Sequence, residues 1–312
     1  MFCIVAFVVL AILGIFSASN RTLAKEALDC VLRRVTFRPC NTGFDEKMKA
    51  KILGVVITRS EKAARFLNRY FEPLSWVFFI LFLASSIWSA RGLYLFYTTG
   101  SCNGLNQTGF CVFDPSGQSN NISTGAQGCK ISQFNGQGPT LKGVDLSLFP
   151  LRNASSPDSI VFIGCYHCDY SRKAYPFIRD LAERFKARLV FLHYPVKESS
   201  DYSTRLGYCV YQENPDDLWK LNDVWFSAAK ANTDDPAFVK KTLVDLGLDP
   251  VRIDSCMNAP QTEAAVSRQL KEIEKTNFYG TPTVFINGEA LVGPKPYRVY
   301  AIALKGLFYW IR

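Results

Sequence analysis

The hydrophobic pattern begins with two apolar runs that carry no charge. They cover residues 2–16 and residues 74–90. A helix needs about 20 apolar residues to cross the hydrocarbon core of a bilayer. We therefore expect residues 74–97 to form a transmembrane helix rather than a buried core helix. Residues 1–17 are expected to form a first, shorter transmembrane helix or signal-anchor, with a cleaved signal peptide as the alternative.

Between the two apolar runs lies a basic segment, residues 18–73. It carries twelve Lys and Arg against six Asp and Glu residues, an excess that is typical of loops kept on the cytoplasmic side of a membrane. The N-terminus and everything after residue 98 would then lie outside. Apolar positions over residues 45–70 predict an amphipathic helix. Cys30 and Cys40 fit no zinc-binding spacing, and we expect both to be reduced thiols.

Residues 98–157 are rich in Gly, Asn, Gln, Ser and Pro, which is typical of an extended linker. The linker contains three cysteines, whose pairing the sequence does not fix: Cys102, Cys111 and Cys129. It also contains three Asn-x-Ser/Thr triplets, which begin at Asn106, Asn121 and Asn153. Such triplets agree with a position outside the cytoplasm.

A globular pattern covers residues 158–312. It reads in order as a strand, a helix, a second strand, a helical block, a hairpin and a final helix, at residues 159–164, 165–186, 189–194, 200–275, 283–292 and 297–311. Asn287-Gly288 is a strong signal for the hairpin turn. This order predicts an α/β protein with a thioredoxin fold and an inserted helical subdomain.

Composition narrows the possible functions. The chain has ten cysteines but only two histidines, so sites built from several histidines are excluded and we expect no metal. The formal net charge is +9, but residues 152–312 contribute only +2 of it. The basic excess therefore belongs to the loop beside the membrane, and we expect no binding to nucleic acid.

The candidate chemistry lies at Cys165-Tyr166-His167-Cys168. A zinc site would need a second cysteine pair at similar spacing, and the sequence has none. The motif follows a predicted strand and opens a predicted helix, where unpaired N–H groups favour an anion. We expect the pKa of the Cys165 thiol to be lowered there, with Cys168 about one helical turn away. His167 is expected to place positive charge near the Cys165 sulfur, and Tyr166 to form part of the surface that faces the substrate.

A second part of the site is expected at Gly280-Thr281-Pro282-Thr283. In the thioredoxin layout this loop faces the cysteine pair and its proline is cis. The backbone of Thr281 would then point at an incoming chain and bind it by short β-type pairing. The alternative is an ordinary trans proline at the start of an edge strand.

Four motifs together resemble the DsbA-like thioredoxin oxidoreductases: Ile163-Gly-Cys-Tyr-His-Cys, Leu189-Val-Phe-Leu-His-Tyr-Pro, Gly280-Thr-Pro-Thr-Val-Phe-Ile-Asn-Gly and Val292-Gly-x-x-Pro-Tyr. The resemblance covers about half of the chain. It implies that Cys165 is the nucleophile, Cys168 the resolving cysteine and Pro282 the cis-proline. Tyr166 departs from the family, which commonly has proline there.

Cys209 and Cys256 bracket the helical block. Outside the cytoplasm they are candidates for a structural disulfide, and the alternative is two separate buried thiols.

The expected function is that of a membrane-tethered, extracytoplasmic oxidase that donates the Cys165–Cys168 disulfide to secreted proteins. It would need no cofactor of its own and would be re-oxidised by a membrane partner of the DsbB or vitamin K epoxide reductase type. The same residues also suit a disulfide reductase or isomerase. A different class, a non-catalytic thioredoxin-fold protein that binds client chains, is the third alternative.

Overall fold

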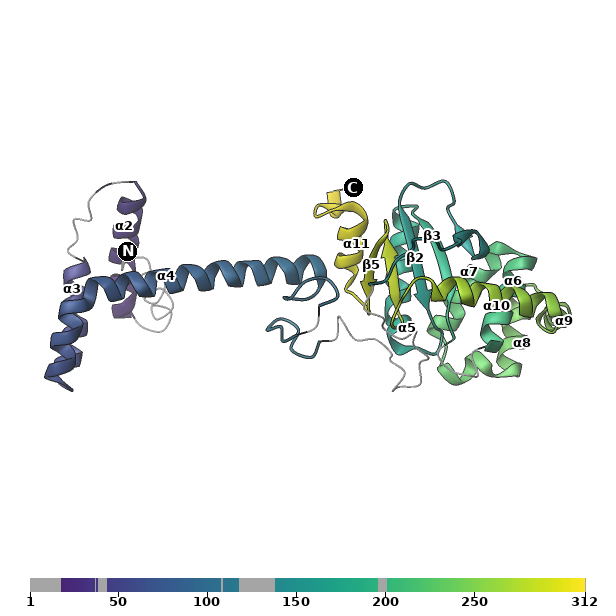
Figure 1. The fold of residues 1–312 in the computed structure, drawn as a ribbon, viewed down its shortest axis with the longest axis horizontal. Coiled ribbons are helices and arrows are strands. Elements are labelled where there is room, and N and C mark those ends of the chain that lie inside the picture. Colours follow the sequence, from purple (N-terminus) through teal and green to yellow (C-terminus); the bar gives the residue numbers. More distant parts are fainter. Residues whose placement is uncertain are drawn as a thin grey trace. The chain divides into compact units, whose positions relative to one another are not determined.

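The computed structural model describes residues 18–36, 38, 44–107, 109–117, 138–195 and 201–311. The chain divides into two compact units, Met1–Arg91 and Gly92–Arg312 (Figure 1). In the described part of the chain the first unit is helical, and the second contains the β-sheet.

The first unit contains α2 (Ala18–Val35), α3 (Phe44–Ile57) and the N-terminal part of α4 (Glu61–Thr99). The amphipathic helix expected over residues 45–70 is divided between α3 and α4. The break occurs because Ser60 caps α4, accepting the Ala63 N–H at 3.4 Å. α4 is kinked at Tyr70, where φ and ψ are −107° and 16°, three residues before Pro73. α2 was not predicted.

Cys30, on α2, is disulfide-bonded. The expectation of a reduced thiol is therefore wrong for this residue. Its partner lies outside the described residues, as do Cys3, Cys40 and Cys129. Disulfides are rare in the cytosol, so a disulfide at Cys30 does not support the cytoplasmic position expected for residues 18–73. That position stays a prediction.

Within the described residues, one helical segment is long and apolar enough to cross a membrane, Trp76–Thr99 on α4. Only 6% of its most apolar window is buried within the structure. This matches the span expected over residues 74–97. The described residues thus contain one of the two expected spans. The other expected span, residues 1–17, lies outside the described residues.

The sheet of the second unit has five strands: β1 (Leu151–Arg152), β2 (Ser159–Gly164), β3 (Arg188–His193), β4 (Thr283–Ile286) and β5 (Glu289–Val292). Their order is β1-β3-β2-β4-β5. β2 and β3 are parallel, and the other pairs are antiparallel. Together with the helices between β3 and β4, this confirms the predicted thioredoxin fold with a helical insertion.

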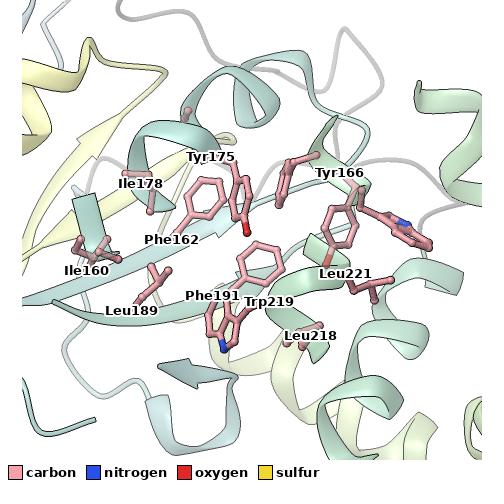
Figure 2. Close-up of a cluster of buried hydrophobic side chains, with 14 of the residues drawn as sticks. Ile160, Phe162, Tyr166, Tyr175, Ile178, Leu189, Phe191, Leu218, Trp219 and Leu221 are labelled. Atoms are coloured by element: carbon pink, nitrogen blue, oxygen red, sulfur yellow. The ribbon is translucent and has the colours of Figure 1, made fainter. Parts of the chain in front are cut away.

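Both faces of the sheet are buried, and β2 shows why. Ile160 and Phe162 point into a cluster that includes residues of α5 (Asp169–Arg184) and α11 (Tyr297–Lys305), as Figure 2 shows for the labelled side chains. Val161 and Ile163 belong to a second cluster on the opposite face. Alternate residues of a strand point to opposite faces, so an uninterrupted apolar run is what a strand covered on both sides requires.

The insert consists of α6 (Asp201–Glu213), α7 (Pro215–Ser227), the 3-10 helix η5 (Lys230–Asp234), α8 (Pro236–Asp245), α9 (Pro250–Met257) and α10 (Pro260–Glu274). Each α-helix after α6 has a proline at its first turn, where the missing N–H costs nothing. A Cys209–Cys256 disulfide joins α6 to α9, which confirms the predicted pair.

The domain begins before residue 158, where the sequence places its start. β1 pairs with β3, and the Thr140 N–H donates to Thr276 O at 2.8 Å. Phe149 is buried in the cluster on the second face. The C-terminal part of the expected linker, from residue 138, is thus packed on the fold.

The start of the expected linker is also held on the domain. Cys102 and Cys111 form a disulfide. Asn106 pairs with β5 through its side chain, donating to Ala290 O and accepting from the Val292 N–H, each at 2.7 Å. These two bonds cover part of an edge strand, and they occupy the side-chain amide of the first Asn-x-Ser/Thr triplet.

Candidate redox site

The cysteine pair lies in the short connection between β2 and α5. Both cysteines are in the thiol form and buried, with Cys165 0% and Cys168 2% exposed. The Cys168 N–H donates to Cys165 O at 3.2 Å, which closes a turn. Gly164 is required before this turn, because a Cβ atom there would lie 2.6 Å from the Phe162 ring.

The helix begins later than predicted. α5 starts at Asp169, and Cys168 is its N-cap residue. The Cys168 Sγ accepts the Ser171 N–H at 3.4 Å, so the N-terminus of the helix is directed at Cys168. The Cys165 N–H donates to Ser171 Oγ at 3.2 Å. Ser171 thus contacts both cysteines, and the sequence analysis missed it. Its signal was its place three residues after an N-cap.

The loop before β4 meets the pair, as predicted. The Thr281–Pro282 peptide bond is cis, and the Cys168 thiol donates to Thr281 O at 3.4 Å. Thr281 is buried, so its side chain does not form part of the outer surface. A chain that pairs with the Thr281 backbone must therefore approach through a region that is covered in this state.

Tyr166 is not on the surface, contrary to the expectation. It is 2% exposed, and its hydroxyl donates to Asn222 Oδ1 on α7 at 2.5 Å. Its ring stacks on His193 with 4.5 Å between centroids, and Figure 2 shows it within the apolar cluster. Burial raises the pKa of the Tyr166 hydroxyl, which therefore stays neutral. Tyr166 therefore fixes the loop between the cysteines to α7 and β3 through its buried side chain.

His167 contacts the helical insert. Its Nε2 lies 2.9 Å from Asp234 Oδ2 and 2.9 Å from Thr233 Oγ1. The residue is 7% exposed. Both partners lie at the end of η5. Neither could be predicted from the sequence, because they are more than 60 residues from His167 along the chain and only the fold brings them together.

Arg172, on α5, links the same loop to the insert. Its Nη1 donates to Tyr166 O at 2.7 Å and to Trp225 O at 2.9 Å. Burial lowers the pKa of Arg172, and the negative charge of Asp169 opposes that shift, as a thiolate at Cys165 would. The two residues between the cysteines are thus attached to α7 and η5 through three independent contacts.

A cavity of about 30 Å³ lies behind Tyr166, between the sheet and α6. Its lining includes polar groups of His193, Thr204, Tyr211 and Gln269. A volume of this size holds about one or two water molecules and is too small for an organic cofactor. Within the described ranges, no group of three His, Cys, Asp or Glu residues is arranged to hold a metal ion.

Comparison with known proteins agrees with this geometry. Residues 166–305 match the family model of the DSBA-like thioredoxin domain, so this part of the chain is similar to such domains. The uncharacterized protein Rv2286c of Mycobacterium tuberculosis is 32% identical over 60 residues, which are 19% of this chain and 26% of that protein. The chain thus spans about a quarter of the length of this curated relative.

Two solved structures are similar at lower identity. The thiol-disulfide exchange protein alpha-DsbA2 of Wolbachia pipientis has 18% identity and a TM-score of 0.43, covering 48% of this chain and 82% of its own. BdbD of Bacillus subtilis has 15% identity and a TM-score of 0.45, covering 53% and 93%.

Proposed function

We propose that this chain is a membrane-tethered thiol–disulfide oxidoreductase that oxidises secreted proteins outside the cytoplasm. The observation that carries the proposal is the Cys165–Cys168 dithiol, which lies at the start of α5 and contacts the loop of cis-Pro282. The match of residues 166–305 to the DSBA-like thioredoxin domain supports it.

The reaction needs only the two sulfurs and the client's thiols. In the oxidised enzyme, a client thiolate attacks Cys165 Sγ, the Cys165–Cys168 bond breaks, and Cys168 leaves as a thiolate. A second client thiolate then attacks the client sulfur of the mixed disulfide and releases Cys165. Two electrons pass from the client to the pair. The leaving Cys168 sulfur is stabilised by the Ser171 N–H and by the N-terminus of α5.

Access to Cys165 requires a local opening, because the residue is fully covered in the dithiol state. A client strand that pairs with the Thr281 backbone would replace the contact between the Cys168 thiol and Thr281 O. The cis-proline loop therefore serves as the client-binding element, and His167 adjusts the stability of the thiolate.

The chain must be re-oxidised after each turnover. A membrane protein of the DsbB or vitamin K epoxide reductase type is the proposed electron acceptor. The apolar segment Trp76–Thr99 supports a position at the membrane. Secreted or otherwise extracytoplasmic proteins are the proposed clients.

The test is disulfide transfer by the purified full chain to a reduced, unfolded client protein. Cys165→Ser should abolish transfer, and Cys168→Ser should accumulate mixed disulfides between Cys165 and the client. The double variant Cys102→Ser/Cys111→Ser is the matched control, and it should keep activity. Unchanged transfer by Cys165→Ser would refute the proposal.

The direction of electron flow is a separate measurement. Equilibration of the full chain with glutathione buffers gives the potential of the pair, read as the alkylated fraction of the active-site peptide. A reduction potential of about −120 mV supports an oxidase. A reduction potential of about −270 mV supports the alternative, a reductase or isomerase. A chain that binds clients without exchange would instead be a non-catalytic client-binding protein.

A further inference from the structure

We propose that Asp234 is a positioning residue that keeps His167 positively charged and thereby sets the reactivity of Cys165; this rests on the proposed exchange chemistry. Asp234 is the last residue of η5. Its Oδ2 lies 2.9 Å from His167 Nε2. Its Oδ1 accepts the Ser203 hydroxyl of α6 at 3.3 Å. The carboxylate is therefore held in place from a second helix.

The hydrogen bonds around His167 determine which ring nitrogen carries a proton. The Thr233 hydroxyl donates to Lys230 O at 2.7 Å, so its oxygen is an acceptor toward His167. The Asp234 carboxylate can only accept. Both contacts therefore require a proton on Nε2. The neutral ring is then the Nε2–H tautomer, and Nδ1 is the nitrogen that gains or loses a proton when the ring titrates.

A carboxylate at this distance favours the doubly protonated ring. Opposite charges within about 4–6 Å stabilise each other's charged forms, and burial strengthens the interaction. With Asp234 present, His167 holds its second proton to higher pH than a buried histidine without a partner would. The imidazolium then stands two residues from Cys165, where it favours the thiolate over the thiol and the reduced pair over the disulfide.

Other charges near this pair do not replace Asp234. Asp169 on α5 is paired with Lys230 at 2.6 Å. Arg172 is directed at two backbone carbonyls of the loop and of α7. His193 on β3 is neutral at physiological pH, because burial lowers its pKa to about 3. Among the described residues, Asp234 makes the ion pair with His167.

The test uses the full chain with Asp234→Asn, which keeps an acceptor oxygen and the size of the side chain but removes the charge. Cys165 should then react more slowly with an alkylating reagent at pH 7. The pH dependence of alkylation should move to higher pH. The equilibrium constant with glutathione should shift about three- to tenfold toward the disulfide. Asp235→Asn removes an equal charge one residue away, from the N-cap of α8, and should leave all three values unchanged.

A second background separates positioning from a structural role. In a His167→Asn chain, Asp234→Asn should have no further effect on alkylation, because no imidazole remains to be charged. Asp234→Glu should restore most of the wild-type profile. An unchanged profile in Asp234→Asn would overturn the inference, as would an equal change in the His167→Asn background or a shift toward the dithiol. The alkylation profile is measured without a client, so it stands even if disulfide transfer fails.

Discussion

Acid should destabilise the domain through His193, at the end of β3. Its Nδ1 lies 2.7 Å from Thr204 Oγ1, and its ring stacks on Tyr166. Burial lowers the pKa of His193 to about 3, and the positive charge of His167 adds to the shift. A histidine in the unfolded chain has a pKa of about 6.5. The unfolded chain therefore takes up this proton before the folded chain does.

The magnitude follows from the gap between these two pKa values. Above pH 6.5, His193 is neutral in both states and contributes no pH dependence. As the pH falls from 6.5 toward 3, the free energy of unfolding decreases by about 1.4 kcal/mol for each pH unit. The loss through His193 is about 2 kcal/mol at pH 5 and approaches about 4–5 kcal/mol near pH 3.

The assay is urea unfolding of the full chain at pH 8 and pH 5, followed by tryptophan fluorescence. His193→Asn has no charge at either pH, so its stability should fall by about 2 kcal/mol less than that of the wild type. His167→Asn should keep most of the wild-type loss, because burial is the larger cause of the shift. Equal losses in wild type and His193→Asn would refute the reasoning.

Three further changes test the fold around the site, each by urea unfolding. Burial lowers the pKa of Lys295 to about 8 from 10.5. The free energy of unfolding of the wild type should therefore rise by up to about 3 kcal/mol between pH 8 and pH 10.5. Lys295→Met should be more stable than the wild type at pH 7 and should not show that rise. Tyr166→Phe should cost about 1–3 kcal/mol, because Asn222 loses a buried partner, and the loss should shrink in an Asn222→Ala background. Replacing Cys209 and Cys256 by Ala should cost up to about 4 kcal/mol, as expected for a disulfide between residues 47 positions apart.

Local signals predicted most of the sheet. The strand expected at residues 159–164 matches β2, and the hairpin expected over residues 283–292 contains β4 and β5. The hairpin turn was predicted from Asn287-Gly288, and both residues have positive φ, 50° and 89°, as a tight hairpin turn requires. These features depend on neighbours in the sequence, and their pattern is therefore visible without the fold.

β1 could not be predicted in the same way. It has two residues, Leu151 and Arg152, within a segment of linker-like composition. Two residues show no periodicity, and the pairing of β1 with β3 depends on a partner almost forty positions away. Composition described the segment correctly as irregular, but it carried no information on whether the segment packs.

The cysteine pair and its cis-proline loop could be predicted, but the electrostatics around them could not. A motif identifies Cys165 and Cys168, whereas the first residue of α5 decides which sulfur the helix N–H groups reach. Because the helix starts at Asp169, that sulfur belongs to Cys168. A shift of four residues in the start of the helix, from 165 to 169, changes which cysteine caps it.

The hydrogen bonds that hold the two residues between the cysteines lead to the insert, while the Tyr166 ring also stacks on His193 of β3. They join positions 53, 56 and 66 residues apart: Arg172 to Trp225, Tyr166 to Asn222, and His167 to Thr233. No local pattern encodes such pairs. A thioredoxin fold without an insert would leave this dipeptide without these partners. The insert therefore acts as part of the redox site. Substitutions in α7 and η5 should alter the chemistry of Cys165, although these elements are remote from it in the sequence.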